Sequence, residues 1–191
     1  MSDVRDDDAV EVRVREDGDL EGCVELTRVV HDIDRYPLVL HANVAAFLSS
    51  RRLLVAWVVR LGGRVVGHVA LHRGSSSPVA SMVAESVGVE PDRIGVVSRL
   101  MVSPSLRRSG VGRRLLRTAA AEAIRRGLPP ALDVVTSYTA AIALYEHERW
   151  RRIGTITLAC PTALRSTSTS TSAQSDPRVD KRARAPLLRQ G

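Results

Sequence analysis

A ten-residue segment, SPSLRRSGVG at 103–112, has the residue types and spacing to bind an anion. The apolar run VVSRLMV at 96–102 precedes it and a helical pattern of leucines and alanines follows, so a strand passes into a helix here. The first backbone amides of a helix have no intrahelical partner and lie at the positive end of the helix dipole. Glycines let an anion approach the main chain, and arginines neutralise its charge. The segment therefore predicts a site for phosphate groups, with Arg107, Arg108, Gly110 and Gly112 as its key residues.

The spacing Arg107-x-x-Gly110-x-Gly112 after a strand resembles the acyl-CoA pyrophosphate loop of the GNAT superfamily of N-acyltransferases. A second segment, 140–150, resembles the later helix of that family, which carries a Leu-Tyr pair, here Leu144 and Tyr145. The resemblance covers residues 10–160. It implies an α/β (α+β) fold with a central mixed, mostly antiparallel sheet that is splayed between strands 4 and 5 and flanked by helices.

The resemblance also implies how acetyl-CoA would be held, without a metal. The diphosphate would rest on the helix N-terminus, and the pantetheine arm would pair with the preceding strand, where a backbone amide polarises the thioester carbonyl. Tyr145 would donate a proton to the departing thiolate, although packing of an aromatic helix residue against the sheet is the alternative. The implied acetyl-CoA contacts are Leu100, Met101, Val102, Arg107, Arg108, Ser109, Gly110, Val111, Gly112 and Arg113.

The residues that would contact an acceptor amine are less specific. Asp34 ends the first predicted helix and Tyr36 follows it, where the family has one wall of its acceptor cleft. Solvated acids and a packed tyrosine are the alternative there. His72, which shares a strand face with His68, and Glu85 could hold a water that takes the proton of the amine. No carboxylate occurs in the strand predicted at 94–102, so no direct general base is visible.

We therefore expect an N-acetyltransferase that moves an acetyl group from acetyl-CoA directly to a primary amine. A GNAT-like module that binds acyl-CoA without turnover is the alternative. Nucleic-acid binding is a weaker hypothesis, because the arginines are not interleaved with aromatic residues that could stack on bases.

Periodicity and turn residues predict the remaining elements. Gly62-Gly63 should turn a hairpin between two strands, and no internal repeat is present. The predicted strands are 10–15, 53–60, 65–72, 94–102, 131–136 and 150–160; the predicted helices are 19–34, 43–50, 79–87, 110–126 and 138–148. No seventh strand is predicted after residue 160.

Length and composition favour one domain of 191 residues with tails. Residues 1–9 should be a flexible acidic N-terminus, 10–160 the folded domain, and 161–191 a disordered, Ser/Thr-rich basic tail. Residues 1–25 hold 3 basic and 10 acidic side chains, whereas 26–160 hold 19 and 9, which suits a partner with several phosphates. Two isolated cysteines and no long apolar run predict a cytoplasmic protein, with a homodimer left open.

Overall fold

The described part of the chain contains five α-helices and ten strands or strand fragments. The computed structural model describes residues 11–75 and 77–157 together with the backbone of 169–172 and 189–190. In chain order the elements are β1 (Val12–Val14), α1 (Leu20–Asp34), α2 (Val44–Leu48), β2 (Leu53–Leu61), β3 (Arg64–Arg73), α3 (Pro78–Val87), β4 (Gly95–Val102), α4 (Val111–Arg125), β5 (Pro130–Ala131), β6 (Asp133–Val135), α5 (Thr139–His147), β7 (Arg151–Arg152), β8 (Gly154–Thr157), β9 (Thr169–Ser172) and β10 (Arg189–Gln190). These bounds confirm the predicted helices and the main strands to within a few residues.

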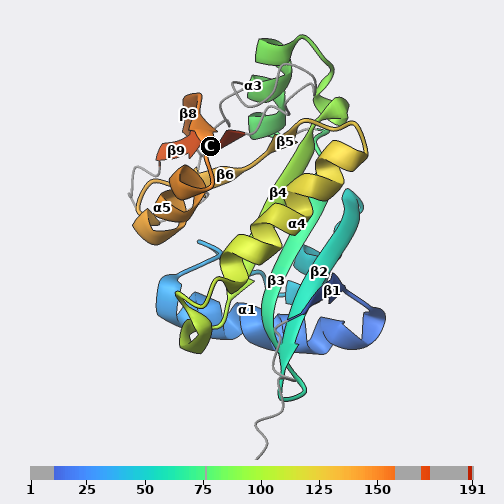
Figure 1. Cartoon of the computed structure of the whole chain (residues 1–191), viewed down its shortest axis with the longest axis vertical. Coiled ribbons are helices and arrows are strands. Elements are labelled where there is room, and N and C mark those ends of the chain that lie inside the picture. The colour runs from blue at the N-terminus through green and yellow to red at the C-terminus, as the bar shows by residue number, and fades with distance from the viewer. Residues whose placement is uncertain (1–10, 76, 158–168, 173–188, 191) are drawn as a thin grey trace, which may run out of the picture. The chain divides into compact units, whose positions relative to one another are not determined.

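Five strands form one mixed sheet in the order β1-β2-β3-β4-β5. β1 and β2 are antiparallel, whereas β4 and β5 run parallel. The turn between β2 and β3 (Figure 1) uses Gly62 and Gly63, both with positive φ, as the predicted hairpin requires. In the part of the chain that is described, β5 pairs with β4 only at Gly95 and Val96, so the rest of β4 lies outside this pairing. This agrees with the predicted splay between strands 4 and 5.

The chain divides into two compact units. The first comprises Met1–Ala70 and Arg99–Ala119, and the second Leu71–Ser98 and Ala120–Gly191. The chain passes from one unit to the other within β3, β4 and α4. The predicted domain at 10–160 is thus shared between both units.

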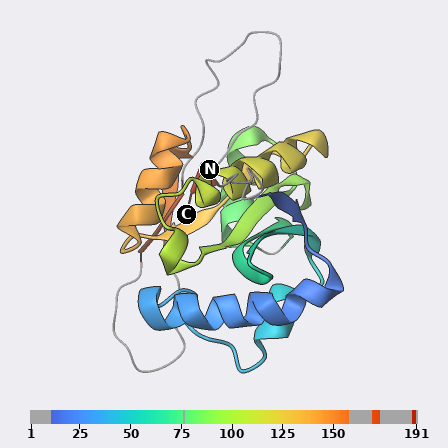
Figure 2. The ribbon, with the colours of Figure 1, turned by 60° about the horizontal axis from the view of Figure 1, so that its bottom comes forward.

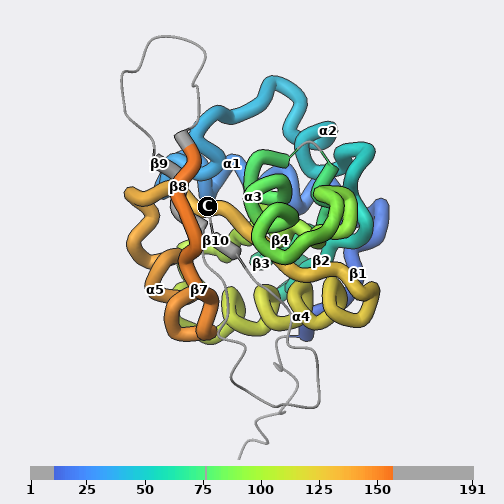
Figure 3. Tube along the Cα trace, turned by 90° about the horizontal axis from the view of Figure 1, so that it is seen from above, coloured from blue at the N-terminus to red at the C-terminus, as the bar shows by residue number. Residues whose placement is uncertain are grey.

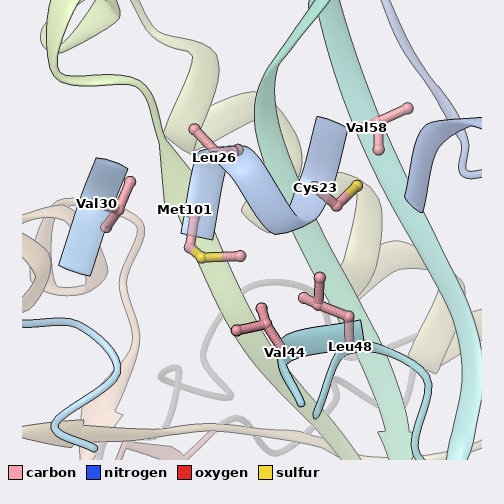
Figure 4. Packing of buried hydrophobic residues seen from close by; sticks show 7 residues of the cluster. All are labelled: Cys23, Leu26, Val30, Val44, Leu48, Val58 and Met101. Carbon is pink, nitrogen blue, oxygen red and sulfur yellow. The ribbon is translucent and has the colours of Figure 1, made fainter. Parts of the chain in front are cut away.

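In the first unit, α1 lies beside α2 (Figure 2), and both pack on strands β2 and β4. Figure 4 shows Cys23, Leu26 and Val30 of α1 with Val44 and Leu48 of α2, and Val58 and Met101 from the strands. All seven side chains are buried, so this cluster fixes α1 and α2 against the sheet. Cys23 is a free thiol, and burial raises its pKa to about 11. Cys160 lies outside the described residues.

A buried carboxylate sets the start of α1. Asp19 is 2 % exposed and accepts hydrogen bonds from Arg13, from Arg60 and from the backbone amide of Glu16. The Glu16 and Asp19 side chains form a reciprocal capping box at the 3-10 turn that leads into α1. Strands β1 and β2 are therefore tied to the helix through one side chain.

In the second unit, α3 packs its apolar face on Ile94, Val96 and Ala131. Ser77 and Pro78 open this helix and Gly88, with φ of 70°, ends it. α5 follows β6, and its end is marked by Arg149 in the left-handed region at φ of 61°. No helix among the described residues has the length and apolarity needed to cross a lipid bilayer.

The region after residue 157 differs from the sequence-based expectation. β9 pairs antiparallel with both β6 and β8, giving a three-stranded sheet in the order β6-β9-β8 in which β8 and β9 lie side by side (Figure 1). The coloured trace in Figure 3 runs from α5 through β7 into β8. β10 pairs with β7. β9 thus lies beyond residue 160, within the tail predicted to be disordered. Threonine favours an extended backbone, and the pairing of β9 occupies one edge each of β6 and β8. The remaining tail residues and residues 1–9 lie outside the described residues.

Candidate functional site

The segment between β4 and α4 is an exposed loop that ends at a helix N-terminus. It contains a 3-10 turn, Pro104–Leu106, and two residues in the left-handed region, Arg108 at φ of 65° and Gly110 at φ of 84°. The first hydrogen bond of α4 runs from the Arg114 amide to the Gly110 carbonyl oxygen at 3.0 Å. The amides of Val111 and Gly112 precede this bond, so they lie at the positive end of the helix dipole.

The first residue of α4 is buried, whereas the loop before it is exposed to solvent. Val111 is buried, whereas 107–110 are exposed. A Cβ on Gly110 would meet nothing within 4 Å, so the space beside the main chain is open. Glycine is favoured here because the backbone has a positive φ. This arrangement can accept a phosphate group on backbone donors.

Two predicted site residues are paired with each other. Arg107 donates through Nη2 to Oδ2 of Asp34, the last residue of α1. Ser109 donates from its hydroxyl to the Leu106 carbonyl oxygen at 2.6 Å. The structure therefore links the loop to the end of α1, a contact that sequence spacing does not reveal.

The predicted pantetheine strand contains a backbone irregularity. Arg99 adopts φ of 53° in the middle of β4, the conformation of a bulge residue, directly before Leu100, Met101 and Val102. Its guanidinium carbon lies 4.4 Å from the centre of the Phe47 ring in α2. The Met101 side chain is buried in the cluster with α1 and α2, so only its backbone groups are left to contact a ligand. The strand ends where the Ser103 amide donates to the Val66 carbonyl oxygen at 2.8 Å.

Tyr145 lies in α5 of the second unit and is 7 % exposed. Its ring centre is 5.9 Å from that of Trp150, with the rings tilted by 49°. The Trp150 amide also donates to the Tyr145 carbonyl oxygen at 2.9 Å. These contacts support the alternative in which Tyr145 packs as a structural residue. Its role as the acid that protonates the thiolate stays a prediction.

The predicted acceptor residues have different surroundings. Tyr36 packs against the buried cluster that α1 and α2 form with the sheet, which matches the alternative of a packed tyrosine. His72 is buried, and its Nδ1 lies 2.9 Å from the hydroxyl oxygen of Ser98 on β4. Glu85 is exposed on α3 and lines a groove with Ser81, Gly88 and Arg93.

His68 was predicted to share a strand face with His72. It is fully buried, and burial is the main cause that lowers its pKa to about 4. Nδ1 of His68 lies 3.0 Å from the Arg99 carbonyl oxygen, and Nε2 lies 3.5 Å from Nη1 of Arg15. A neutral imidazole with this low pKa is a poor proton acceptor at neutral pH. Sequence reasoning missed its contact with the bulge, since neither the bulge nor the position of Arg15 leaves a sequence signal.

Metal chemistry has no candidate in the described part of the chain. No group of three or more His, Cys, Asp or Glu side chains there could hold a metal ion.

Comparisons with known proteins concern the family and the fold of the chain. Residues 24–149 match the model of the acetyltransferase (GNAT) family. No curated protein matches the chain. Solved structures with a similar fold include yncA of Salmonella typhimurium, a putative acetyltransferase with its cofactor acetyl-CoA (19 % identity, 93 % of this chain and 97 % of that chain, TM-score 0.65). Others are an N-acetyltransferase from Kribbella flavida (22 %, 85 % and 95 %, 0.61) and the ribosomal-protein-S18-alanine N-acetyltransferase from Escherichia coli (20 %, 84 % and 89 %, 0.60).

The family match spans well over half of the chain, and the neighbours share its mixed sheet and flanking helices. The loop and helix start described above lie within the matched residues. The chain therefore belongs to the GNAT family of acetyltransferases.

Proposed function

We propose that this chain transfers an acetyl group from acetyl-CoA directly to a primary amine. The amine nitrogen attacks the thioester carbonyl, the carbon–sulfur bond breaks, and the thiolate leaves as CoA after taking up a proton. The observation that carries the proposal is the exposed loop before α4, with left-handed Arg108 and Gly110 and the first amides of the helix. A structural neighbour described with acetyl-CoA supports the choice of acyl donor.

In this proposal the diphosphate binds at the start of α4. The amides of residues 108–113 donate to it, and Arg107 or Arg108 adds charge-assisted hydrogen bonds. Backbone groups of Leu100, Met101 and Val102 pair with the pantetheine arm. An amide after the Arg99 bulge then donates to the thioester oxygen as that atom becomes negative.

Tyr145 is the proposed acid for the thiolate. A phenol of ordinary pKa near 10 is protonated at neutral pH and can donate to a thiolate within hydrogen-bond reach. Asp34 and Tyr36 are the proposed contacts of the amine, with His72 and Glu85 as the groups that hold a proton-accepting water.

A second candidate, an acyl-CoA-binding module without turnover, is favoured by one specific feature. Strand β4, Gly95–Val102, contains no Asp or Glu, so the chain offers no carboxylate base on that strand.

Thiol release separates the two candidates. The full chain is incubated with acetyl-CoA and a panel of small amines, amino acids and peptides, and free CoA is measured against an amine-free control. Amine-dependent release supports the transferase. Binding of acetyl-CoA with no release above the control supports the module, and absence of binding contradicts both.

A further inference from the structure

The left-handed residue in β4 needs a local cause. Arg99 has φ of 53°, a conformation that is unfavourable for a residue with a side chain and that persists only when its surroundings enforce it. The peptide group that follows Arg99 is also the one that starts the proposed pantetheine strand. Whatever holds the Arg99 carbonyl therefore sets the direction of the next amide, that of Leu100, because both belong to one planar peptide unit.

The side chain that contacts this carbonyl is His68 of β3. Its Nδ1 is 3.0 Å from the Arg99 carbonyl oxygen, which can only accept, so Nδ1 carries the proton. Its Nε2 is 3.5 Å from Nη1 of Arg15, which can only donate, so Nε2 is the unprotonated nitrogen. Both neighbours select the same neutral tautomer. Burial keeps the ring neutral at physiological pH by lowering its pKa to about 4.

Arg15 is held in turn by the end of α2. Its Nη1 donates to the Leu48 carbonyl oxygen at 3.1 Å, and its Nη2 donates to the Ser49 hydroxyl at 3.2 Å. The Arg15 amide donates to the Ala56 carbonyl oxygen of β2 at 2.8 Å. A continuous line of contacts thus runs from α2 through Arg15 and His68 to the bulge, all within the first unit.

We infer that His68 is a positioning residue that holds the Arg99–Leu100 peptide in the orientation needed to donate to the thioester oxygen. The inference rests on the proposed acetyl transfer. His68 does not exchange a proton with the substrate, and its contribution is geometric. A misdirected donor stabilises the developing oxyanion less, so the loss should appear in kcat. Binding of acetyl-CoA should change little, because the diphosphate is assigned to the start of α4.

Three variants test this role. His68→Leu removes the donor, whereas His68→Asn keeps an N–H group near the position of Nδ1. Thr27→Val is the matched control: Thr27 is also fully buried in the first unit and donates to a backbone carbonyl, that of Cys23, at 2.7 Å. For each variant, kcat, the KM for acetyl-CoA and the melting temperature are measured with an amine that the wild-type chain acetylates.

We expect kcat to fall at least tenfold in His68→Leu, with the KM for acetyl-CoA within threefold of wild type. His68→Asn should restore kcat to within threefold, and Thr27→Val should lower the melting temperature without lowering kcat. Wild-type kcat in His68→Leu, or an equal loss in the Leu and Asn variants, overturns the inference while leaving the acetyl transfer intact. A wild-type chain that releases no CoA with any amine overturns both.

A spectroscopic measurement on the unmodified chain covers the case in which His68→Leu does not fold. Long-range ¹H–¹⁵N NMR distinguishes the two neutral tautomers of a histidine ring. We expect His68 with Nδ1 protonated and no change of its ring signals between pH 8 and pH 6. A protonated Nε2 overturns the inference.

Discussion

Arg107 pairs with Asp34 in the structure, whereas the proposed function assigns Arg107 to a diphosphate. The two side chains are 45 % and 36 % exposed, so the pair contributes at most about 1 kcal/mol. Asp34→Asn should therefore tighten acetyl-CoA binding by up to about fivefold, because Arg107 no longer leaves an ion pair to reach the ligand. Isothermal titration calorimetry measures this change.

Glu25→Gln is the matched control for Asp34→Asn. It removes the same charge from another exposed ion pair of the first unit, that with Arg64 at 3.8 Å. We expect it to leave the Kd unchanged. Weaker acetyl-CoA binding in Asp34→Asn alone would mean that the pair supports the loop rather than competing with the ligand.

Tyr145→Phe tests the proposed acid. Removal of the phenol should lower kcat by about a hundredfold, in the range of general acid catalysis, with little change in the Kd of acetyl-CoA. Tyr138→Phe is the control, since Tyr138 directly precedes α5 and has no assigned proton-transfer role. Unchanged turnover in Tyr145→Phe would remove the Tyr145 hydroxyl from the proton transfer.

Asp19 gives the fold a specific acid sensitivity. Burial raises the pKa of this carboxyl, but the hydrogen bonds from Arg13, from the Glu16 amide and from Arg60 outweigh it, and the pKa in the folded chain is lowered. A lowered pKa means that the unfolded chain binds the proton more readily. The stabilising contribution of Asp19 is therefore complete above about pH 5 and is lost as the pH falls through the unfolded value toward the folded one.

Asp19→Asn should cost about 2 kcal/mol of unfolding free energy at pH 7, because neutral hydrogen bonds replace the charge-assisted ones to two partly exposed arginines. The difference from wild type should shrink on acidification from pH 5 to pH 3, as measured by urea unfolding at each pH. A difference that stays constant over this range would contradict the role given to the Asp19 carboxylate.

At the scale of the elements, Gly110 tests whether the start of α4 binds the diphosphate. Gly110→Ala places a Cβ at φ of 84°, which costs about 1 kcal/mol in backbone strain even though the space beside it is open. Because the strained residue carries a proposed diphosphate donor, we expect the Kd of acetyl-CoA to rise about tenfold.

Gly88→Ala is closely matched to Gly110→Ala. Gly88 has φ of 70°, also with nothing within 4 Å of a Cβ, but it ends α3 in the second unit. It should lose similar stability in thermal unfolding and bind acetyl-CoA as wild type does. Equal effects of both variants on the Kd would attribute the change to stability rather than to the loop.

The helices were predictable because their apolar spacing and end signals agree. Gly88 follows α3, the glycine pair turns the β2–β3 hairpin, and the arginine and glycine spacing identified the loop before α4. α5 ends at Arg149 in the left-handed region, where a glycine is the more usual residue, so its end carries a weaker sequence signal than that of α3. β9 was not foreseen, because a Ser/Thr run has no apolar face, and its pairing with β6 and β8 depends on contacts distant in sequence.

For the whole chain, sequence and structure differ most where side chains from distant segments meet. The pairs Arg107 with Asp34, His68 with Arg15 and His72 with Ser98 join residues 26 to 73 positions apart. Local patterns report the type and spacing of residues and cannot report such contacts. They could therefore predict the loop before α4 and the family but not the hydrogen bonds around the β4 bulge.

The central claim is that the chain holds acetyl-CoA chiefly by its diphosphate at the start of α4. Calorimetric titration of the full chain with acetyl-CoA and, separately, with S-acetyl-pantetheine, which lacks the nucleotide and its phosphates, tests this claim most directly. We predict a Kd for acetyl-CoA in the range of about 1 μM to 1 mM, typical of enzyme substrates, and binding at least about a hundredfold weaker without the diphosphate. Equal affinity for both compounds, or no heat with millimolar acetyl-CoA, would contradict it.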